Sequence, residues 1–330
     1  MLRLFEKNTG LQAVLVTLAL VLLWLPSLLA PPPMEPSTGE APLYGLLFGL
    51  SLPPLAAVIV AMLLVLVGGL LLNLKLANNG LVSQNTLLPT LMYIVAMSAT
   101  ESTLSPTLLT GVASVGVIGI LLVHGTPMTL TTNKICNATA LIGITSMFYL
   151  PALALLLTYL LVTINYRLYR WRDYAAMLLG LLAPYIALWC TLFMHGTLDS
   201  YWLAVADSLS GIGLVLAPTD TLGTLANAVI VLFMAVSIFS VWAKMGKNTL
   251  LWQKNATSLM LLTMTGVLLL FYTQLFPLRL SLFAIPFAFC GALRFIMGAK
   301  RSKSRSSSRK FHIPVFDLLF IIILIAAFLC

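Results

Sequence analysis

The sequence predicts an all-α fold: a polytopic transmembrane helix bundle of about nine full spans plus a pair of short helices. Hydrophobic residues make up 60% of the chain and charged residues only 8%, whereas soluble domains carry roughly 25% charged residues. Apolar runs of about 20 residues, the length that crosses a ~30 Å hydrocarbon core, recur along the whole sequence. Of the 18 lysines and arginines, all except Arg279 can be threaded onto one side of a membrane, as expected for cytoplasmic loops.

The N-terminal half predicts four full spans. Arg3 and Lys7 place the N-terminus in the cytoplasm, and the first outer loop carries Glu35 and Glu40 without any basic residue. A second, tight outer turn carries Glu101. The spans are predicted over residues 11–30, 54–74, 84–99 and 106–124.

The apolar stretch 138–165 predicts two short helices rather than one span. Basic residues flank both of its ends, so both ends belong in the cytoplasm. One helix of this length would reach about 42 Å, which suffices for one tilted crossing but not for two. Pro151 lies at the midpoint, where proline removes a backbone donor and breaks or kinks a helix. We therefore expect two helices that meet near residues 149–151 and form a buried wedge.

The C-terminal half predicts five further spans and a helix over 202–217 that lies on the outer surface. The spans are predicted over residues 175–194, 221–243, 256–275, 281–298 and 313–329. Three segments follow: a transmembrane domain over 1–299, a basic cytoplasmic linker over 300–312, and a C-terminal transmembrane helix over 313–330 that ends on the periplasmic side. The linker is interpreted as a stop-transfer signal, with contact to anionic membrane lipid as the alternative.

The composition excludes several classes of function. The net charge of +9 is spread over short loops, which indicates topology and lipid contact and no nucleic-acid partner. The four cysteines form no CxxC pair, and no P-loop, GxSxG, HExxH or dinucleotide fingerprint is present. The spans are nearly uncharged, which speaks against an ion-driven carrier.

The candidate chemistry lies at the outer ends of the helices. Glu35 or Glu40, Glu101 and Arg279 are placed there by the threading and can converge on one outward-facing cavity. A carboxylate in such a cavity can act as a general base or hold a divalent metal ion. An arginine can hold a phosphate by paired hydrogen bonds.

Several stretches, taken in order, carry a family resemblance. They are Gly39-Glu-Ala-Pro-Leu-Tyr44, Gly49-Leu-Ser-Leu-Pro-Pro-Leu55, Ser98-Ala-Thr-Glu-Ser-Thr-Leu-Ser-Pro106, the broken segment from Ala140 with Gly180-Leu-Leu-Ala-Pro184 behind it, and Arg279-Leu-Ser-Leu-Phe-Ala-Ile-Pro286. In this order the chain resembles the GT-C superfamily, membrane glycosyltransferases that take sugars from polyprenyl-phosphate or polyprenyl-diphosphate donors at the outer face. Over its whole length it resembles more closely a group of polytopic bacterial inner-membrane proteins without an assigned activity.

The resemblance implies a multi-pass protein of a bacterial inner membrane that handles a polyprenyl-phosphate-linked sugar at the periplasmic face. Glu40 would be the catalytic base, with Glu35 as the second choice. Glu101 would support the base, bind substrate or hold a divalent metal ion, and Arg279, aided by His195, would hold the donor phosphate. Two alternatives stay open: a non-catalytic scaffold or accessory subunit with an envelope protein as partner, and a lipid-linked-glycan flippase or transporter.

Overall fold

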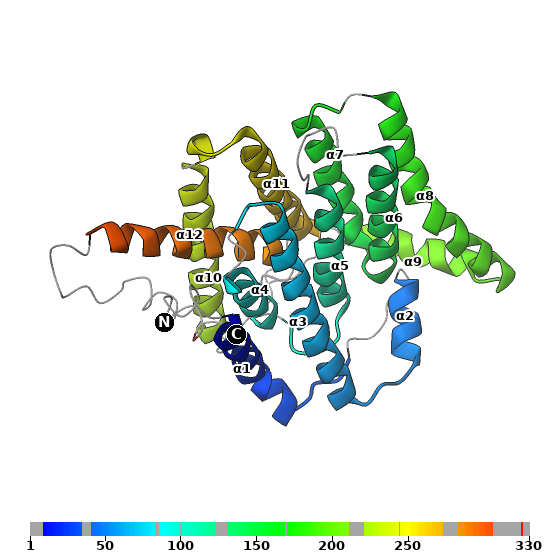
Figure 1. Ribbon diagram of the computed structural model, residues 1–330. Helices are drawn as coiled ribbons and strands as arrows, with labels where there is room; N and C mark the ends of the chain where they lie inside the picture. Colours follow the sequence, from blue (N-terminus) through cyan, green and yellow to red (C-terminus); the bar gives the residue numbers. More distant parts are fainter. Residues whose placement is uncertain are drawn as a thin grey trace.

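A computed structural model of the chain describes residues 9–34, 41–82, 86–99, 101–122, 131–168, 170–210, 221–243, 245–272 and 283–305, together with residue 325. These residues form helices and connecting loops and contain no strand, which confirms the all-α prediction (Figure 1). The helices are α1 (Thr9–Leu29), α2 (Pro42–Gly49), α3 (Pro54–Asn78), α4 (Leu88–Ser98), α5 (Pro106–Leu121), α6 (Thr132–Phe148), η3 (Leu150–Ala154), α7 (Leu155–Asn165), α8 (Trp171–Met194), α9 (Leu198–Ser210), α10 (Thr221–Trp242), η4 (Met245–Lys247), α11 (Leu250–Tyr272) and α12 (Ala284–Arg305).

Three helices in the described part of the chain, α1, α3 and α8, are long and apolar enough to cross a membrane. Helices also occupy the other predicted spans that fall on described residues, but several of them are shorter. The 11 residues of α4 give a helix of about 16 Å, well short of a ~30 Å hydrocarbon core. The prediction of nine full spans is therefore not confirmed. Except for residue 325, the predicted span over 313–329 lies outside the described residues.

The broken segment follows the sequence prediction closely. The first helix of the pair, α6, ends at Phe148, and Tyr149 adopts an extended conformation with φ −152° and ψ 103°. A short 3-10 helix containing Pro151 then leads into α7. The Tyr149 carbonyl accepts the Ala152 amide at 2.9 Å, so the break keeps its backbone hydrogen bonds. Two helices meeting near residues 149–151 are thus confirmed, although α6 begins at Thr132 rather than at residue 138.

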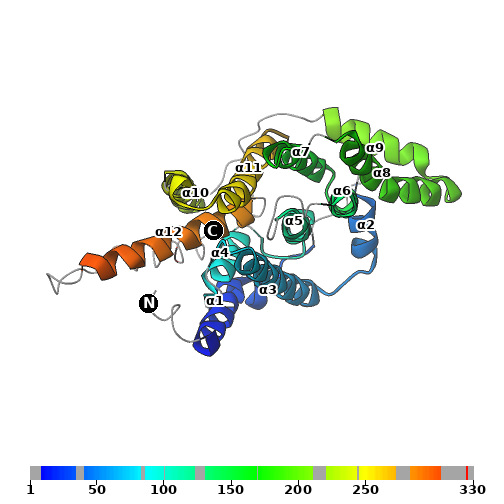
Figure 2. The same cartoon turned by 45° about the horizontal axis from the view of Figure 1, so that its top comes forward.

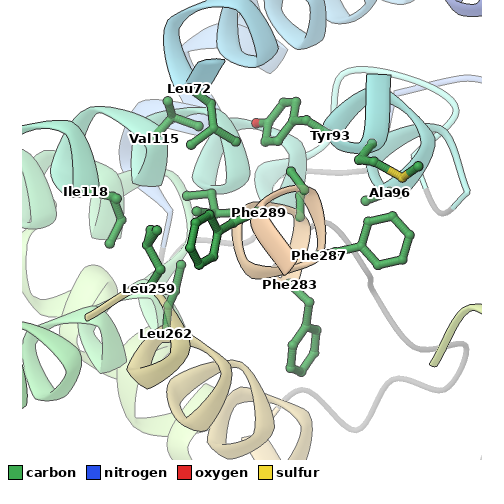
Figure 3. Close-up of a cluster of buried hydrophobic side chains, with 14 of the residues drawn as sticks. Leu72, Tyr93, Ala96, Val115, Ile118, Leu259, Leu262, Phe283, Phe287 and Phe289 are labelled. Atoms are coloured by element: carbon green, nitrogen blue, oxygen red, sulfur yellow. The ribbon is translucent and has the colours of Figure 1, made fainter. Parts of the chain in front are cut away.

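The centre of the molecule is built on α4 and the first half of α12. Every residue of α4 from Leu88 to Met97 is buried, and these two helices pack against each other. Figure 3 shows Phe287 and Phe289 of α12 among side chains of the surrounding helices, with Tyr93 of α4 nearby. A helix that is apolar on all sides is expected in the core of a bundle.

The direction of α12 differs from the prediction. In Figure 1, α3 and α10 run up the page, whereas α12 runs across it. The segment predicted as a span over 281–298 thus packs across its neighbours rather than alongside them. Figure 2 shows the same arrangement from a second direction, with α10 and α11 on one side of α12 and with α1, α3 and α4 on the other.

Close contact between α6 and α8 depends on two glycines. A Cβ atom on Gly180 would lie 2.2 Å from Oγ1 of Thr139 and 2.4 Å from the carbonyl oxygen of Cys136. A Cβ atom on Gly143 would lie 2.6 Å from Cγ of Pro184. Small residues let helix backbones approach closely, which is the usual basis of helix association in an apolar medium. The α6–α8 pair is accordingly the most extensive helix pair of the fold.

We predict that Gly180→Ala lowers the thermal stability of the purified protein. The added methyl group meets a backbone carbonyl that cannot rotate away, and overpacking of this kind costs about 1–3 kcal/mol. The measurement is the midpoint of thermal unfolding in detergent. Gly10→Ala on α1 is the matched control, because nothing lies within 4 Å of its Cβ position. An unchanged midpoint for Gly180→Ala would contradict the packing described above.

Candidate functional site

Of the five residues predicted to form the site, the structure describes Glu101 and His195. Glu35, Glu40 and Arg279 lie outside the described residues. The convergence of Glu40, Glu101 and Arg279 on one cavity therefore stays a prediction. Glu101 has hydrogen-bond partners among the described residues, at the turn between α4 and α5.

The Glu101 carboxylate is buried in the turn between α4 and α5, with 5% of the residue exposed. Thr107 Oγ1 donates a hydrogen bond to Oε1 at 2.6 Å, and Ser105 Oγ donates one to Oε2. The Glu101 amide donates to the Met97 carbonyl at 3.0 Å, which continues the hydrogen bonding of α4. Both carboxylate oxygens are thus held by hydroxyl groups from the start of α5.

Ser105 links this carboxylate to the helix that follows. It is the N-cap of α5, and its side-chain oxygen accepts the Leu108 amide at 3.1 Å. Pro106 occupies the first helical position, where a missing amide proton costs nothing. Because Ser105 accepts from the helix while it donates to Glu101, the acid is positioned by the helix start itself.

Tyr44 connects the chain just after the predicted first outer loop to the same turn. Its side chain is 0% exposed, and its hydroxyl donates to the Leu104 carbonyl at 3.2 Å. Tyr44 lies in α2, and Ala41, directly before this helix, is also buried. Tyr44, the last residue of the first-loop motif, is therefore in contact with the turn between α4 and α5, 60 residues away in the sequence.

Thr103 adds a further polar group to the turn. Its side chain is buried, and its hydroxyl has no hydrogen-bond partner among the described residues. A buried hydroxyl without a partner costs about 1–3 kcal/mol, so such a group is unusual away from a ligand site. Together, Thr103, Ser105 and Thr107 surround the turn with hydroxyl groups.

Metal binding at this turn has little support from the residues that the structure describes. They contain no group of three or more His, Cys, Asp or Glu side chains that could hold a metal ion. Each oxygen of Glu101 already accepts a hydroxyl hydrogen bond. The described residues alone do not make a metal site, and the prediction of Glu101 as a metal ligand rests on partners outside them.

His195 lies at the far end of α8. It is exposed, it follows the last helical residue, and its amide donates to the Thr191 carbonyl at 3.1 Å. Gly196 then reverses the chain with φ +67° before α9 begins. Its local role is to end the helix, and its role in phosphate binding stays a prediction.

Sequence reasoning missed the hydroxyl partners of Glu101. A signal was present, since Ser105-Pro106 is a typical N-cap followed by proline at the first helical position. Placing the helix start there would have brought Ser105 and Thr107 next to the acid. The contact between Tyr44 and Leu104 had no signal in the sequence beyond the family resemblance.

We predict energetic coupling between Glu101 and Thr107. Glu101→Gln and Thr107→Val should each destabilise the protein, and the double variant should lose less than the sum of the two. Because the glutamine amide oxygen can still accept from Thr107, the coupling energy should be about 1–1.5 kcal/mol, the difference between a hydrogen bond to a charged acceptor and one to a neutral acceptor. The measurement is a double-mutant cycle of unfolding free energies in detergent.

Thr110 provides the control for this cycle, because its hydroxyl donates to the Pro106 carbonyl within its own helix. The pair Glu101→Gln and Thr110→Val should be additive. Coupling of equal size in both cycles would contradict the prediction. It would mean that the coupling energy does not come from the hydrogen bond between Thr107 and Glu101.

The chain matches no protein-family model and no curated protein. The resemblance to the GT-C superfamily therefore stays a prediction from the sequence.

Proposed function

We propose that this chain is a multi-pass protein of a bacterial inner membrane, with a GT-C-like bundle, that transfers a sugar from a polyprenyl-phosphate carrier at the periplasmic face. The single observation that carries the proposal is the hydrogen bond between Tyr44 and Leu104. It brings the end of the first-loop motif against the turn that holds Glu101. In the proposed enzyme these two segments form the floor of the catalytic site.

The proposed base is Glu40, with Glu35 as the second candidate. Glu40 directly precedes the buried Ala41 and lies four residues before Tyr44, so a short stretch of chain separates it from the Glu101 turn. It would take the proton of an acceptor hydroxyl as the acceptor oxygen attacks the anomeric carbon of the sugar. The bond from that carbon to the carrier phosphate breaks, and polyprenyl phosphate leaves with the electron pair.

The other predicted residues take supporting parts in this proposal. Glu101 holds the turn in place through its hydroxyl partners, which keeps the floor of the site rigid. Arg279 would neutralise the phosphate of the donor and of the leaving group, assisted by His195.

The distribution of basic loops supports the proposed orientation. Two connections lie at the upper end of the bundle in Figure 1. The connection between α7 and α8 carries Arg167 and Arg170, and the connection between α10 and α11 contains η4 (Met245–Lys247). The α2 helix and the start of α3 lie at the lower end. We therefore propose that the upper end and the N-terminus face the cytoplasm and that the C-terminus is periplasmic.

One observation favours a second candidate function. The Glu101 carboxylate is buried, and each of its oxygens accepts a hydrogen bond from Ser105 or Thr107, as expected for an acid with a structural part. A scaffold or accessory subunit of an envelope assembly, with the fold but without the chemistry, accounts for this equally well.

The test of the enzyme is the release of polyprenyl phosphate from a synthetic short-chain polyprenyl-phosphate sugar, followed by chromatography. We predict that Glu40→Gln lowers the rate by about 100-fold or more, the contribution typical of a general base. Arg279→Gln should raise the donor KM. Asp199→Asn, at an exposed acid in the first turn of α9, is the control and should leave the rate unchanged.

Wild-type activity that survives in Glu40→Gln would remove Glu40 from the mechanism. A wild-type protein that is inactive with every donor while its folding is intact would favour the scaffold.

The proposed orientation predicts which positions a membrane-impermeant maleimide can label in intact bacterial cells. On a background without native cysteines, Pro33→Cys and Gly196→Cys should be labelled, because both lie at the proposed outer end and are exposed. Arg172→Cys and Asn248→Cys, also exposed, should be labelled only after permeabilisation. The reverse pattern would invert the orientation and move the proposed site to the cytoplasmic face.

A further inference from the structure

A second polar site lies at the opposite end of the bundle, where α6, α7 and α8 meet. Asp173 sits in the first turn of α8, one of the helices long enough to span a membrane, yet it is only 6% exposed. The neighbouring Trp171 is 77% exposed and Arg172 is also exposed. Aromatic and basic side chains at the end of a spanning helix mark the level of the lipid headgroups. Asp173 is therefore a recessed acid at headgroup level.

The partners of Asp173 within the described residues leave its charge unbalanced. Thr132 of α6 donates a hydrogen bond to Oδ1 at 2.9 Å, and the Asp173 amide donates to the Arg170 carbonyl at 3.0 Å. No lysine or arginine in the described part of the chain forms an ion pair with the carboxylate, although three arginines precede it within a few residues. A buried charge without a counter-charge is costly unless something else pairs with it.

An independent observation points to the same place. Tyr159 of α7 is 1% exposed, and its hydroxyl is buried without a hydrogen-bond partner among the described residues. This hydroxyl lies within electrostatic range of Asp173 and Cys136. The tight contact of Gly180 with Cys136 and Thr139 brings α8 against the same part of α6. An acid on α8, a phenol on α7 and a thiol on α6 therefore lie in one region of the bundle.

We propose that this region binds the ammonium group of an ethanolamine phospholipid headgroup. An ammonium group carries three donors, and it would find the Asp173 carboxylate and the Tyr159 hydroxyl oxygen as acceptors. The phosphate of the same headgroup would then lie at the exposed Arg170 and Arg172. A zwitterionic headgroup thus matches both signs of charge at this end of the bundle.

Simpler structural roles for Asp173 do not explain the buried Tyr159 hydroxyl, which has no hydrogen-bond partner among the described residues. An acid in the first turn of a helix is stabilised by the helix dipole, and its bond to Thr132 ties α8 to α6. Neither role uses the Tyr159 hydroxyl, and neither distinguishes one lipid from another. The proposal is independent of the proposed glycosyl transfer, because it concerns the other end of the bundle.

The test compares two lipids that differ only at the nitrogen atom. The full-length protein is reconstituted in nanodiscs with equal amounts of dioleoyl phosphatidylethanolamine and dioleoyl phosphatidylcholine, and the lipids retained after detergent extraction are counted by native mass spectrometry. Phosphatidylcholine has the same phosphate, but its trimethylammonium group has no N–H to donate. We expect about a tenfold excess of phosphatidylethanolamine, the ratio that corresponds to a hydrogen bond to a charged group.

The variants separate lipid binding from structure. Asp173→Asn still accepts from Thr132 but loses the charge, so the excess should fall close to one while the unfolding midpoint is retained. Tyr159→Phe, which removes only the hydroxyl, should lower the excess severalfold. Thr132→Val breaks the tie between the helices but keeps the acid, so the excess should persist. Asp199→Asn, at an exposed acid outside this cluster, should change nothing.

Three outcomes would overturn the proposal. The first is an equal retention of both lipids by the wild-type protein. The second is an excess that persists in Asp173→Asn. The third comes from a second set of nanodiscs that also contains dioleoyl phosphatidylglycerol, an anionic lipid without an amine. If Asp173→Asn loses this lipid in parallel with phosphatidylethanolamine, the site recognises the phosphate and not the ammonium group.

Discussion

The need to satisfy backbone hydrogen bonds within the chain is the constraint on which the rest of this structure depends. In an apolar medium no water replaces a missing partner, so the chain must be helical and each helix end must be closed locally. The ends of α3, α7 and α8 show how this is done. Each end has a residue with positive φ, namely Gly80, Arg167 and Gly196. In each case the amide of the following residue donates a hydrogen bond to the carbonyl five residues before it. Arg167 adopts this conformation without being glycine, at a cost of about 1–2 kcal/mol.

The same constraint explains how polar side chains enter apolar helices. In α6, the hydroxyl groups of Thr139, Thr145 and Ser146 donate to carbonyl groups of their own helix. Ser146 is also within hydrogen-bond distance of the Tyr185 hydroxyl on α8, at 2.7 Å. Polar groups that are satisfied inside one helix let that helix pack closely against apolar neighbours. The buried wedge of α6 and α7 can therefore be rich in threonine and still lie inside the bundle.

Hydropathy predicted the all-helical class and the positions of several helices, because an apolar helix appears as a continuous run in the sequence, although nine full spans are not confirmed. The runs at 11–30, 54–74 and 175–194 coincide with α1, α3 and α8, and Pro151 marked the break between α6 and α7. Hydropathy has no information on direction, since helix orientation is set by packing against neighbours. Hydropathy could therefore predict a helix within 281–298, but it could not show that α12 runs across its neighbours.

The site was harder to predict because the groups that hold its carboxylate in place are uncharged hydroxyl groups. Glu101 is visible in the sequence as an acid in an outer turn, but Ser105 and Thr107, which hold it, look like ordinary loop and helix residues. A threading based on charge places loops on sides of the membrane and says nothing about hydroxyl groups. Asp173 was similarly counted as a charge on the cytoplasmic side, and its burial against Thr132 emerged only from the packing of α6 on α8.

The two buried acids are stabilised by the same chemistry at opposite ends of the bundle. Glu101 and Asp173 each accept hydrogen bonds from hydroxyl groups, and Asp173 forms no ion pair with a described lysine or arginine. A buried ion pair would recover little of its desolvation cost and would neutralise the carboxylate. At Asp173 the hydroxyl donor holds the acid in place and leaves its negative charge available. Between the two ends, the described core around α4 and α12 is mainly apolar, as Figure 3 shows for its aromatic part. This separation favours polar ligands handled at each face over a polar ligand carried through the bundle.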